Sequence, residues 1–238
     1  GTCVPPPLYQ LSAQQTLALF LDFDGTLVDI ADHPDAVIVG PNLTDHLHRL
    51  DDGLAGRLAI ITGRPLGALD AFLGPNHIKA VGSHGGEYRG APLPPPPLAP
   101  TSLKSIAALQ AQWPQLVVEP KPYGMAVHYR QEPQAASSVL STMENIAKIE
   151  SMVAKSGKML VEVGPKNTNK GNAVHALMKT DSFQKSQPIF IGDDITDEDG
   201  FLAVQHYGGH GILVGPPRPT AANYNLPSPS AVLNWLGL

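Results

Sequence analysis

Four short apolar runs, each closed by a turn that contains glycine, most constrain how this chain of 238 residues can fold. The predicted strands that contain them cover residues 17–23, 57–62, 188–191 and 211–214, and the first two apolar runs themselves are residues 17–21 and 58–61. Each has the length of a strand that is buried on both faces, and stretches with helical spacing lie between them. This alternation predicts an α/β fold with a Rossmann-like, doubly wound parallel sheet and helices on both of its faces.

The pattern changes in the middle of the chain, where helices and strands follow one another as in a small α+β unit. The sequence there predicts helices over 101–113 and 134–154, strands over 116–119, 125–130 and 158–163, and a turn at 121–124. We therefore expect a catalytic core of residues 1–95 and 166–238, with a cap domain of residues 96–165 inserted into it. Residues 91–100 read APLPPPPLAP, which favours a stiff polyproline II linker; a ligand for an SH3-like partner is the alternative.

Composition and charge exclude several classes of protein. The single cysteine, Cys3, cannot form an intrachain disulfide, and no cysteine and histidine cluster has zinc-binding spacing. A net charge of −5 argues against general nucleic-acid binding, and no apolar run is long enough to cross a bilayer. No secretory signal is recognisable, so we expect a cytoplasmic protein without nucleic-acid or membrane partners. We expect a monomer, with a weak dimer as the alternative.

Carboxylates directly follow two of the apolar runs, in the segments Asp22-Phe23-Asp24-Gly25-Thr26 and Gly192-Asp193-Asp194. In open α/β sheets, sites lie outside the carboxyl ends of the strands, so these groups are expected to meet. Like charges brought together repel unless a cation lies between them, and hard carboxylate oxygens suit Mg²⁺. For each motif taken alone, the alternatives are an Asx turn and a helix N-terminus that favours acids.

Two further polar residues lie where an anion would bind. Thr62 ends the second apolar run and can place a hydroxyl beside a phosphate oxygen; capping the next helix is the alternative. Lys170 precedes a helical stretch, where a cation opposes the helix dipole and so points to a bound anion. A solvated lysine is the alternative for Lys170.

These four elements, in this order, resemble the motifs of the haloacid dehalogenase superfamily of aspartate-dependent phosphotransferases. Asp22-Phe23-Asp24-Gly25-Thr26 resembles the first motif, Thr62 the second, Lys170 the third, and Gly192-Asp193-Asp194 with Asp197 the fourth. Further segments are similar to trehalose-6-phosphate phosphatases, namely GSHGGE at 82–87, KPYGMAVHYR at 121–130, and VEV at 161–163 leading to NKG at 169–171. The resemblance spans about residues 17–214, and it implies an α/β cap between the second and third motifs.

The resemblance implies a reaction through an aspartyl-phosphate intermediate, with Mg²⁺ as cofactor. Asp22 is then the nucleophile. Asp24 protonates the leaving sugar oxygen and afterwards activates a water molecule. The implied metal ligands are a carboxylate oxygen of Asp22, the backbone carbonyl of Asp24, and Asp193.

Supporting roles follow from the same resemblance. Thr62 and Lys170 stabilise the phosphoryl oxygens, while Asp194 and Asp197 lie behind the metal ligands and orient Lys170 and metal-bound water. The residues expected to bind substrate are Arg64, Ser83, His84, Glu87, Lys121, His128, Arg130, Glu162, Lys166 and Asn169. Lys166 is a candidate replacement for the basic residue that related sequences often have at Gly164.

Strand alternation in the cap supports a binding role without reference to a family. In a strand over 125–130, His128 and Arg130 point to one side, and Glu162 lies on the polar side of the strand over 158–163. One sheet face can then pack on helices while the other presents these groups; a solvated sheet face is the alternative. We expect a lid that binds a sugar phosphate, with Lys121 and Glu162 contacting sugar hydroxyls.

The leading hypothesis is a Mg²⁺-dependent enzyme that hydrolyses trehalose 6-phosphate. Within the enzyme class, the alternatives are a phosphatase for another sugar phosphate, such as sucrose phosphate, or a phosphohexomutase. From other classes, they are a phosphorylated signalling domain and an inactive sugar-phosphate-binding module. Asp24 and the size of the cap argue against the signalling domain, and no catalytic position is replaced.

Overall fold

The computed structural model describes residues 2–90, 97–121, 124–166 and 168–238. The chain divides into a core unit of residues 1–92 and 169–238 and an insert unit of residues 93–168. The domain boundaries expected after residues 95 and 165 lie within three residues of these divisions. Most of the proline-rich segment and the middle of the turn expected at 121–124 lie outside the described residues, so both stay predictions.

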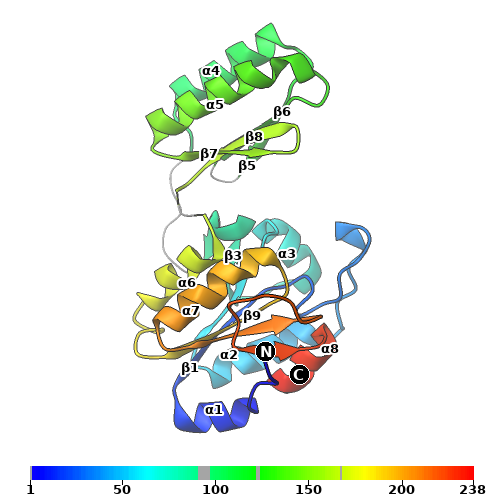
Figure 1. The fold of residues 1–238 in the computed structure, drawn as a ribbon, viewed down its shortest axis with the longest axis vertical. Helices are drawn as coiled ribbons and strands as arrows, with labels where there is room; N and C mark the ends of the chain where they lie inside the picture. The colour runs from blue at the N-terminus through cyan, green and yellow to red at the C-terminus, as the bar shows by residue number, and fades with distance from the viewer. Residues whose placement is uncertain (1, 91–96, 122–123, 167) are drawn as a thin grey trace. The chain divides into compact units, whose positions relative to one another are not determined.

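Within its described residues, the core unit contains one seven-stranded sheet in the order β11-β10-β9-β1-β2-β3-β4. Strands β1, β3 and β9 of this sheet are labelled in Figure 1. The strands are β1 (Leu17–Leu21), β2 (Leu58–Ile61), β3 (Lys79–Gly82), β4 (Glu87–Arg89), β9 (Gln187–Gly192), β10 (His210–Val214) and β11 (Tyr224–Leu226). Neighbouring strands are parallel, except that β4 runs antiparallel to β3. β1 is central, with β2 on one side and β9 on the other, so the predicted doubly wound sheet is confirmed.

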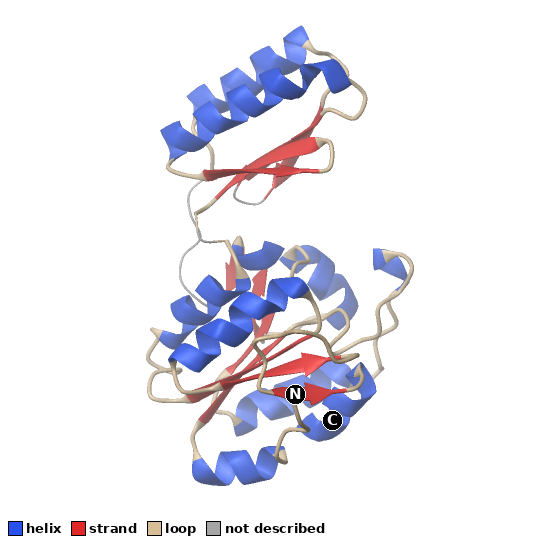
Figure 2. Cartoon of the chain, in the orientation of Figure 1, coloured by secondary structure: helices blue, strands red, loops and turns tan. Residues whose placement is uncertain are grey.

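Helices cover both faces of this sheet (Figure 2). They are α2 (Leu43–Gly53), α3 (Leu66–Leu73), α6 (Lys170–Met178), α7 (Glu198–His206) and α8 (Pro229–Leu236). In β1, Leu17, Leu19 and Leu21 pack into the hydrophobic core that includes α2, α3 and α8. Ala18 and Phe20 point the other way and pack into a second core with α6 and α7. Because both faces are buried, the strand is apolar throughout, which makes it recognisable in the sequence.

In the part of the insert unit that the structure describes, an antiparallel sheet of four strands has the order β5-β6-β8-β7. The elements are α4 (Pro100–Gln112), β5 (Val117–Lys121), β6 (Gly124–His128), α5 (Ala136–Glu150), β7 (Val153–Gly157) and β8 (Leu160–Gly164). Met125, Val127, Val161 and Val163 pack with residues of α4 and α5, which cover one face of the sheet (Figure 1). The predicted α+β insert is therefore confirmed.

The helix expected over 134–154 is wrong in its extent. It ends at Glu150, because Ser151 adopts a left-handed conformation with a φ of +55°. Residues of β7 then form the edge strand that the helix prediction had absorbed. Glycine usually occupies a left-handed helix end, so a serine there gives the sequence only a weak stop signal.

Several elements were not predicted, namely α1 (Leu8–Gln14), β4, β11 and α8, together with the 3₁₀ helices η1 (Pro34–Ala36), η2 (Ser83–Gly85), η3 (Pro133–Ala135) and η4 (Ile195–Asp197). The sequence does carry signals for α8. Ser228 accepts a hydrogen bond from the Ala231 N–H at 3.1 Å, Pro229 begins the helix, and Gly237 follows its end. None of the helices in the described ranges combines the length and hydrophobicity needed to cross a membrane.

Candidate active site

The polar ends of β1, β2 and β9 meet at one edge of the core sheet. Asp22 directly follows β1, and its backbone N–H donates to the carbonyl of Ile191 in β9 at 2.9 Å. Thr62 directly follows β2, and Asp193 follows β9. Asp22 and Asp193, which are far apart in the sequence, therefore lie close together, as expected where an open sheet changes its winding direction.

Lys170 lies between two buried carboxylates. Its Nζ donates to Asp22 Oδ1 at 3.0 Å and to Asp197 Oδ1 at 2.7 Å. Burial opposes the charge of Lys170, but attraction to the two carboxylates outweighs it and raises the pKa of Lys170. Burial, opposed by Lys170, raises the pKa of Asp22 to about 7. Burial and repulsion from Asp22 raise the pKa of Asp197 to about 7 as well. The site holds more carboxylates than a single lysine can balance.

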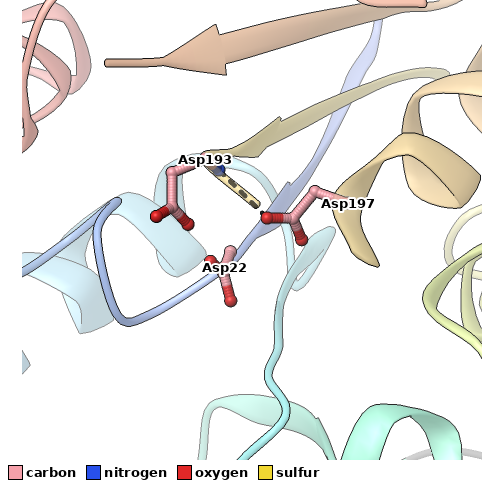
Figure 3. Close-up of side chains that lie close together, drawn as sticks. All are labelled: Asp22, Asp193 and Asp197. Atoms are coloured by element: carbon pink, nitrogen blue, oxygen red, sulfur yellow. Dashed lines mark hydrogen bonds between the residues drawn. The ribbon is translucent and has the colours of Figure 1, made fainter. Parts of the chain in front are cut away.

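Asp193 and Asp197 differ in how their oxygens are used. Asp197 Oδ2 accepts the backbone N–H of Asp193 at 3.0 Å (Figure 3). It also accepts the N–H of Asp194 at 3.0 Å, while Asp197 Oδ1 binds Lys170. Asp193 Oδ1 is buried and has no hydrogen-bond partner in the described part of the chain. A buried anionic oxygen without a partner is costly, and an adjacent cation removes that cost.

The donor set fits a divalent cation that prefers oxygen ligands. One carboxylate oxygen from each of Asp22, Asp193 and Asp197 lies within 4.8 Å of the others. Both oxygens of Asp197 accept short hydrogen bonds, whereas Asp22 Oδ2 has only a 3.5 Å contact from Thr26 Oγ1 and Asp193 Oδ1 has no partner among the described residues. Asp22 and Asp193 are therefore the carboxylates best placed to bind a cation. Hard oxygen ligands without sulfur or imidazole match Mg²⁺.

Asp24 is held by Arg64 in a two-pronged ion pair. Arg64 Nε donates to Asp24 Oδ2 at 2.6 Å, and Nη2 donates to Oδ1 at 2.8 Å. The hydrogen bond to Asp24 raises the pKa of Arg64. Nη2 also donates to the Pro34 carbonyl at 2.8 Å, and the guanidinium carbon lies 4.9 Å from the centre of the Phe72 ring. Arg64, expected to bind substrate, therefore contacts the predicted acid and base.

A cavity of about 790 Å³ opens beside these groups. The predicted site residues in its lining are Asp22, Asp24, Thr62, Arg64, His84, Lys170, Asp193 and Asp194. The Thr62 side chain is buried, and its Oγ1 accepts the backbone N–H of Arg64 at 3.1 Å. The structure thus brings the four residues predicted to be catalytic to a single cavity.

Three residues expected to bind substrate make supporting contacts within the core unit. Glu87 Oε2 accepts Ser83 Oγ at 2.7 Å and the N–H of the first residue of α3 at 3.0 Å. Asn169 Oδ1 accepts the Asn172 N–H at 2.8 Å and so caps α6, the helix that begins with Lys170. These contacts fix the backbone around the cavity.

The face of the insert sheet opposite α4 and α5 carries charged groups. Glu119 lies 2.7 Å from Lys121 Nζ and 2.7 Å from His128 Nε2, one contact on each oxygen. These two hydrogen bonds lower the pKa of Glu119. The bond to Glu119 and, to a smaller extent, the charge of Glu162 raise the pKa of Lys121. The strand register places Glu162 on the same face as His128.

Two predicted binding residues, Arg130 and Lys166, lie outside this face. One residue of the face, Glu119, was not predicted. The strand expected over 125–130 ends at His128, so Arg130 lies in an exposed turn and strand alternation does not align it with His128. Lys166 lies in the exposed turn after β8. Glu119 was missed because we expected its strand to end there, although alternation along β5 places it beside Lys121.

The core sheet, the charged strand ends and the insert define a phosphatase fold of the haloacid dehalogenase type. A solved phosphatase of the haloalkanoate (HAD) enzyme superfamily from Bacteroides thetaiotaomicron has this fold. It matches with a TM-score of 0.58 at 15% identity, covering 92% of this chain and 94% of that chain. At this identity the likeness establishes the fold alone.

The particular family follows from closer relatives. The model of the trehalose-phosphatase family matches residues 20–93 and 104–230. The trehalose-6-phosphate phosphatase of Escherichia coli (strain K12) is 36% identical over 234 residues, which cover 95% of this chain and 87% of that protein. A solved trehalose-6-phosphate phosphatase of Aspergillus fumigatus is 24% identical, with a TM-score of 0.72 over 100% of this chain and 98% of that chain. The chain belongs to the trehalose-phosphatase family.

Proposed function

We propose that this protein hydrolyses trehalose 6-phosphate to trehalose and inorganic phosphate, with Mg²⁺ as cofactor. The observation that carries the proposal is the convergence of Asp22, Lys170 and Asp193 Oδ1, which has no partner among the described residues, beside one cavity. A carboxylate next to a buried lysine supplies both a nucleophile and a positive charge for a phosphoryl group. The substrate is inferred from the family.

The reaction consists of two displacements at phosphorus. In the first, an Asp22 oxygen attacks phosphorus, the ester P–O bond breaks, and Asp24 donates a proton to the leaving sugar oxygen. In the second, Asp24 accepts a proton from the water that attacks the aspartyl-phosphate, which frees phosphate and regenerates Asp22. Lys170 and Thr62 stabilise the phosphoryl oxygens. Both oxygens of Asp24 accept from Arg64, and each keeps a second lone pair through which a proton can be transferred.

Asp22, Asp193 and the backbone carbonyl of Asp24 would hold the cation. When bound, the ion supplies positive charge that offsets the repulsion between an anionic phosphate and the carboxylates. Asp22 must be ionised to attack, but burial, only partly offset by Lys170, raises its pKa to about 7. Positive charge beside Asp22 lowers this pKa and keeps the nucleophile ionised at neutral pH. Asp197 accepts a second hydrogen bond from Lys170 Nζ and so orients Lys170 toward Asp22.

Recognition of the sugar is assigned to the charged face of the insert unit, formed by Glu119, Lys121, His128 and Glu162. Carboxylates accept hydrogen bonds and ammonium groups donate them, so together they match the mixed character of sugar hydroxyls. The contacts of Glu119 with Lys121 and His128 hold these side chains in a defined arrangement. Arg130 and Lys166 remain predicted binding residues.

The test is Mg²⁺-dependent phosphate release from trehalose 6-phosphate, sucrose 6-phosphate, glucose 6-phosphate and mannose 6-phosphate. We expect a strong preference for trehalose 6-phosphate. EDTA and the variant Asp22→Asn should each lower phosphate release by several orders of magnitude, because an amide is not a nucleophile toward phosphorus. Circular dichroism of Asp22→Asn controls for loss of folding.

Each other result contradicts a defined part of the proposal. Preferred turnover of another sugar phosphate would refute the substrate while leaving the chemistry intact. Full activity of Asp22→Asn would refute the nucleophile. Movement of the phosphoryl group between sugar positions without free phosphate would identify a mutase, and no turnover of any ester would favour a signalling or binding domain.

A further inference from the structure

The loop between β10 and β11 is bonded to the acidic segment that begins with Asp193. Glu198, the first residue of α7, accepts three hydrogen bonds from this loop. The donors are Arg218 Nη1 at 2.9 Å, Thr220 Oγ1 at 2.7 Å and the Ala221 N–H at 2.7 Å. Arg218 Nη2 also donates to the backbone carbonyl of Asp193 at 3.4 Å. One guanidinium therefore links the two ends of the segment from Asp193 to Glu198.

The loop itself is hydrogen-bonded to α7 and to β10. Gln205 of α7 donates from Nε2 to the Ala221 carbonyl at 2.5 Å and to Asn223 Oδ1 at 3.1 Å. Asn223 Oδ1 also accepts the N–H of Gly211 in β10 at 2.9 Å. These hydrogen bonds hold the loop in place, and Arg218 connects the loop to the segment from Asp193 to Glu198.

The buried Oδ1 of Asp193 has no hydrogen-bond partner within the described residues, so no bond to this oxygen holds the side chain in place. The position of the carboxylate is therefore set by the hydrogen bonds of the Asp193 backbone. Its N–H donates to Asp197 Oδ2 at 3.0 Å, the dashed line in Figure 3, and its carbonyl accepts from Arg218. Asp197 therefore holds one side of the peptide backbone at Asp193, and Arg218 holds the other. A shift of this backbone moves the Asp193 carboxylate relative to Asp22.

We propose that Arg218 is a positioning residue for the divalent cation. By joining Glu198 to the carbonyl of Asp193, it holds the Asp193 carboxylate where a cation can bind it together with Asp22. This inference rests on the cation site of the proposed function. The planar guanidinium makes both contacts at once, whereas the ammonium group of a lysine is a single charged point.

The test is the dissociation constant of Mg²⁺, measured by isothermal titration calorimetry in the absence of substrate. We expect it to rise about tenfold or more in Arg218→Gln, because loss of a residue behind a metal ligand typically lowers metal affinity about 10- to 100-fold. A smaller rise is expected in Arg218→Lys. At saturating Mg²⁺, the KM for trehalose 6-phosphate should keep its original value, which a general loss of structure would not allow.

Arg89→Gln is the matched control. Arg89 forms an ion pair with Asp70 on the edge strand β4, and its side chain is 26% exposed, against 28% for Arg218. Loss of this pair should leave the Mg²⁺ dissociation constant unchanged. An equal rise in Arg89→Gln and Arg218→Gln would mean that any lost ion pair in the core unit weakens the site, and would overturn the specific role of Arg218.

The remaining outcomes separate this inference from its premise. Unchanged Mg²⁺ affinity in a folded Arg218→Gln overturns it; if that variant does not fold, unchanged affinity in Arg218→Lys does the same. Asp193→Asn tests the premise. Unchanged affinity in Asp193→Asn would refute the proposed cation site itself, whereas loss of binding there with normal binding in Arg218→Gln would refute only the role of Arg218.

Discussion

The charged side chains at the strand ends are buried where solvent cannot stabilise them. Lys170 is 3% exposed and Asp197 is fully buried, and both depend on their mutual hydrogen bond. Breaking a buried ion pair by removing one partner costs about 3–5 kcal/mol, and here the loss of Asp197 would leave Lys170 with Asp22 as its one remaining carboxylate among the described residues. Asp197 therefore keeps Lys170 charged and fixed beside Asp22, although Asp197 and Asp22 repel each other.

Asp51 on α2 is a buried carboxylate outside the site, and it allows a test of what such a charge costs. It is 7% exposed, and its Oδ1 has no partner among the described residues. Burial, opposed by attraction to Lys79, raises the pKa of Asp51. A raised folded-state pKa means that ionisation destabilises the fold as pH rises above the unfolded pKa of about 3.9. Asp51→Asn should therefore increase the free energy of unfolding at pH 7 by about 1 kcal/mol.

Chemical denaturation at several pH values checks this expectation. The gain from Asp51→Asn should shrink as pH falls toward 4 and vanish about one pH unit below the unfolded pKa of about 3.9, where the carboxyl group is neutral in both states. Asp181→Asn, which neutralises an exposed carboxylate of the core unit, should show no comparable gain. A less stable Asp51→Asn at pH 7, or a gain that does not depend on pH, would contradict the assigned cost.

Single residues were predictable from the sequence where strand ends fixed them. Asp22, Thr62 and Asp193 directly follow apolar runs, and Lys170 begins a helix that the sequence indicates. Two other contacts of the site were not predictable, because the hydrogen bonds of Arg64 to Asp24 and of Arg218 to Glu198 join residues 40 and 20 positions apart. Such contacts depend on tertiary packing, and no local pattern of residues encodes them.

At the scale of elements, the turn after β1 places Gly25 against Asp193. Gly25 has a φ of +77°, and a Cβ at this position would overlap the Asp193 carboxylate. We expect Gly25→Ala to displace Asp193 and to weaken Mg²⁺ binding about tenfold or more, as measured by calorimetry. The left-handed backbone should cost a further ~1 kcal/mol of stability.

Gly237→Ala isolates the steric effect from the backbone effect. Gly237 also has a φ of +77°, but nothing lies within 4 Å of the position of its Cβ. This variant should lose stability by a similar amount and bind Mg²⁺ as the original protein does. Equal Mg²⁺ affinity in the two variants would contradict the view that the turn after β1 fixes the position of Asp193.

The elements themselves differ in how well the sequence predicts them. Strands buried on both faces, such as β1 and β9, appear as apolar runs and were predicted to within about two residues. The edge strand β7 was missed, because its burial is low and the strongly periodic α5 directly precedes it. Edge strands have one neighbour and little buried surface, so they leave a weak hydrophobic pattern.

At the scale of the whole molecule, each unit has a hydrophobic core of its own. Ile106, Val139 and Val161 belong to the core of the insert unit, whereas the core unit buries both faces of its sheet. The proposed reacting groups all come from the core unit, and the proposed sugar-binding face comes from the insert unit. Substitutions in the two units should therefore affect different kinetic quantities.

Glu119→Gln tests this division, because it removes a charge that binds Lys121 and His128 while preserving size. We expect the KM for trehalose 6-phosphate to rise about tenfold, since a hydrogen bond to a charged group contributes about 1.5 kcal/mol. Hydrolysis of p-nitrophenyl phosphate, which has no sugar hydroxyls, should keep its rate. Glu144→Gln, the same change at an exposed position on α5, should alter neither. Equal losses with both esters would mean that Glu119 supports folding or the reacting groups, and would contradict separate roles for the two units.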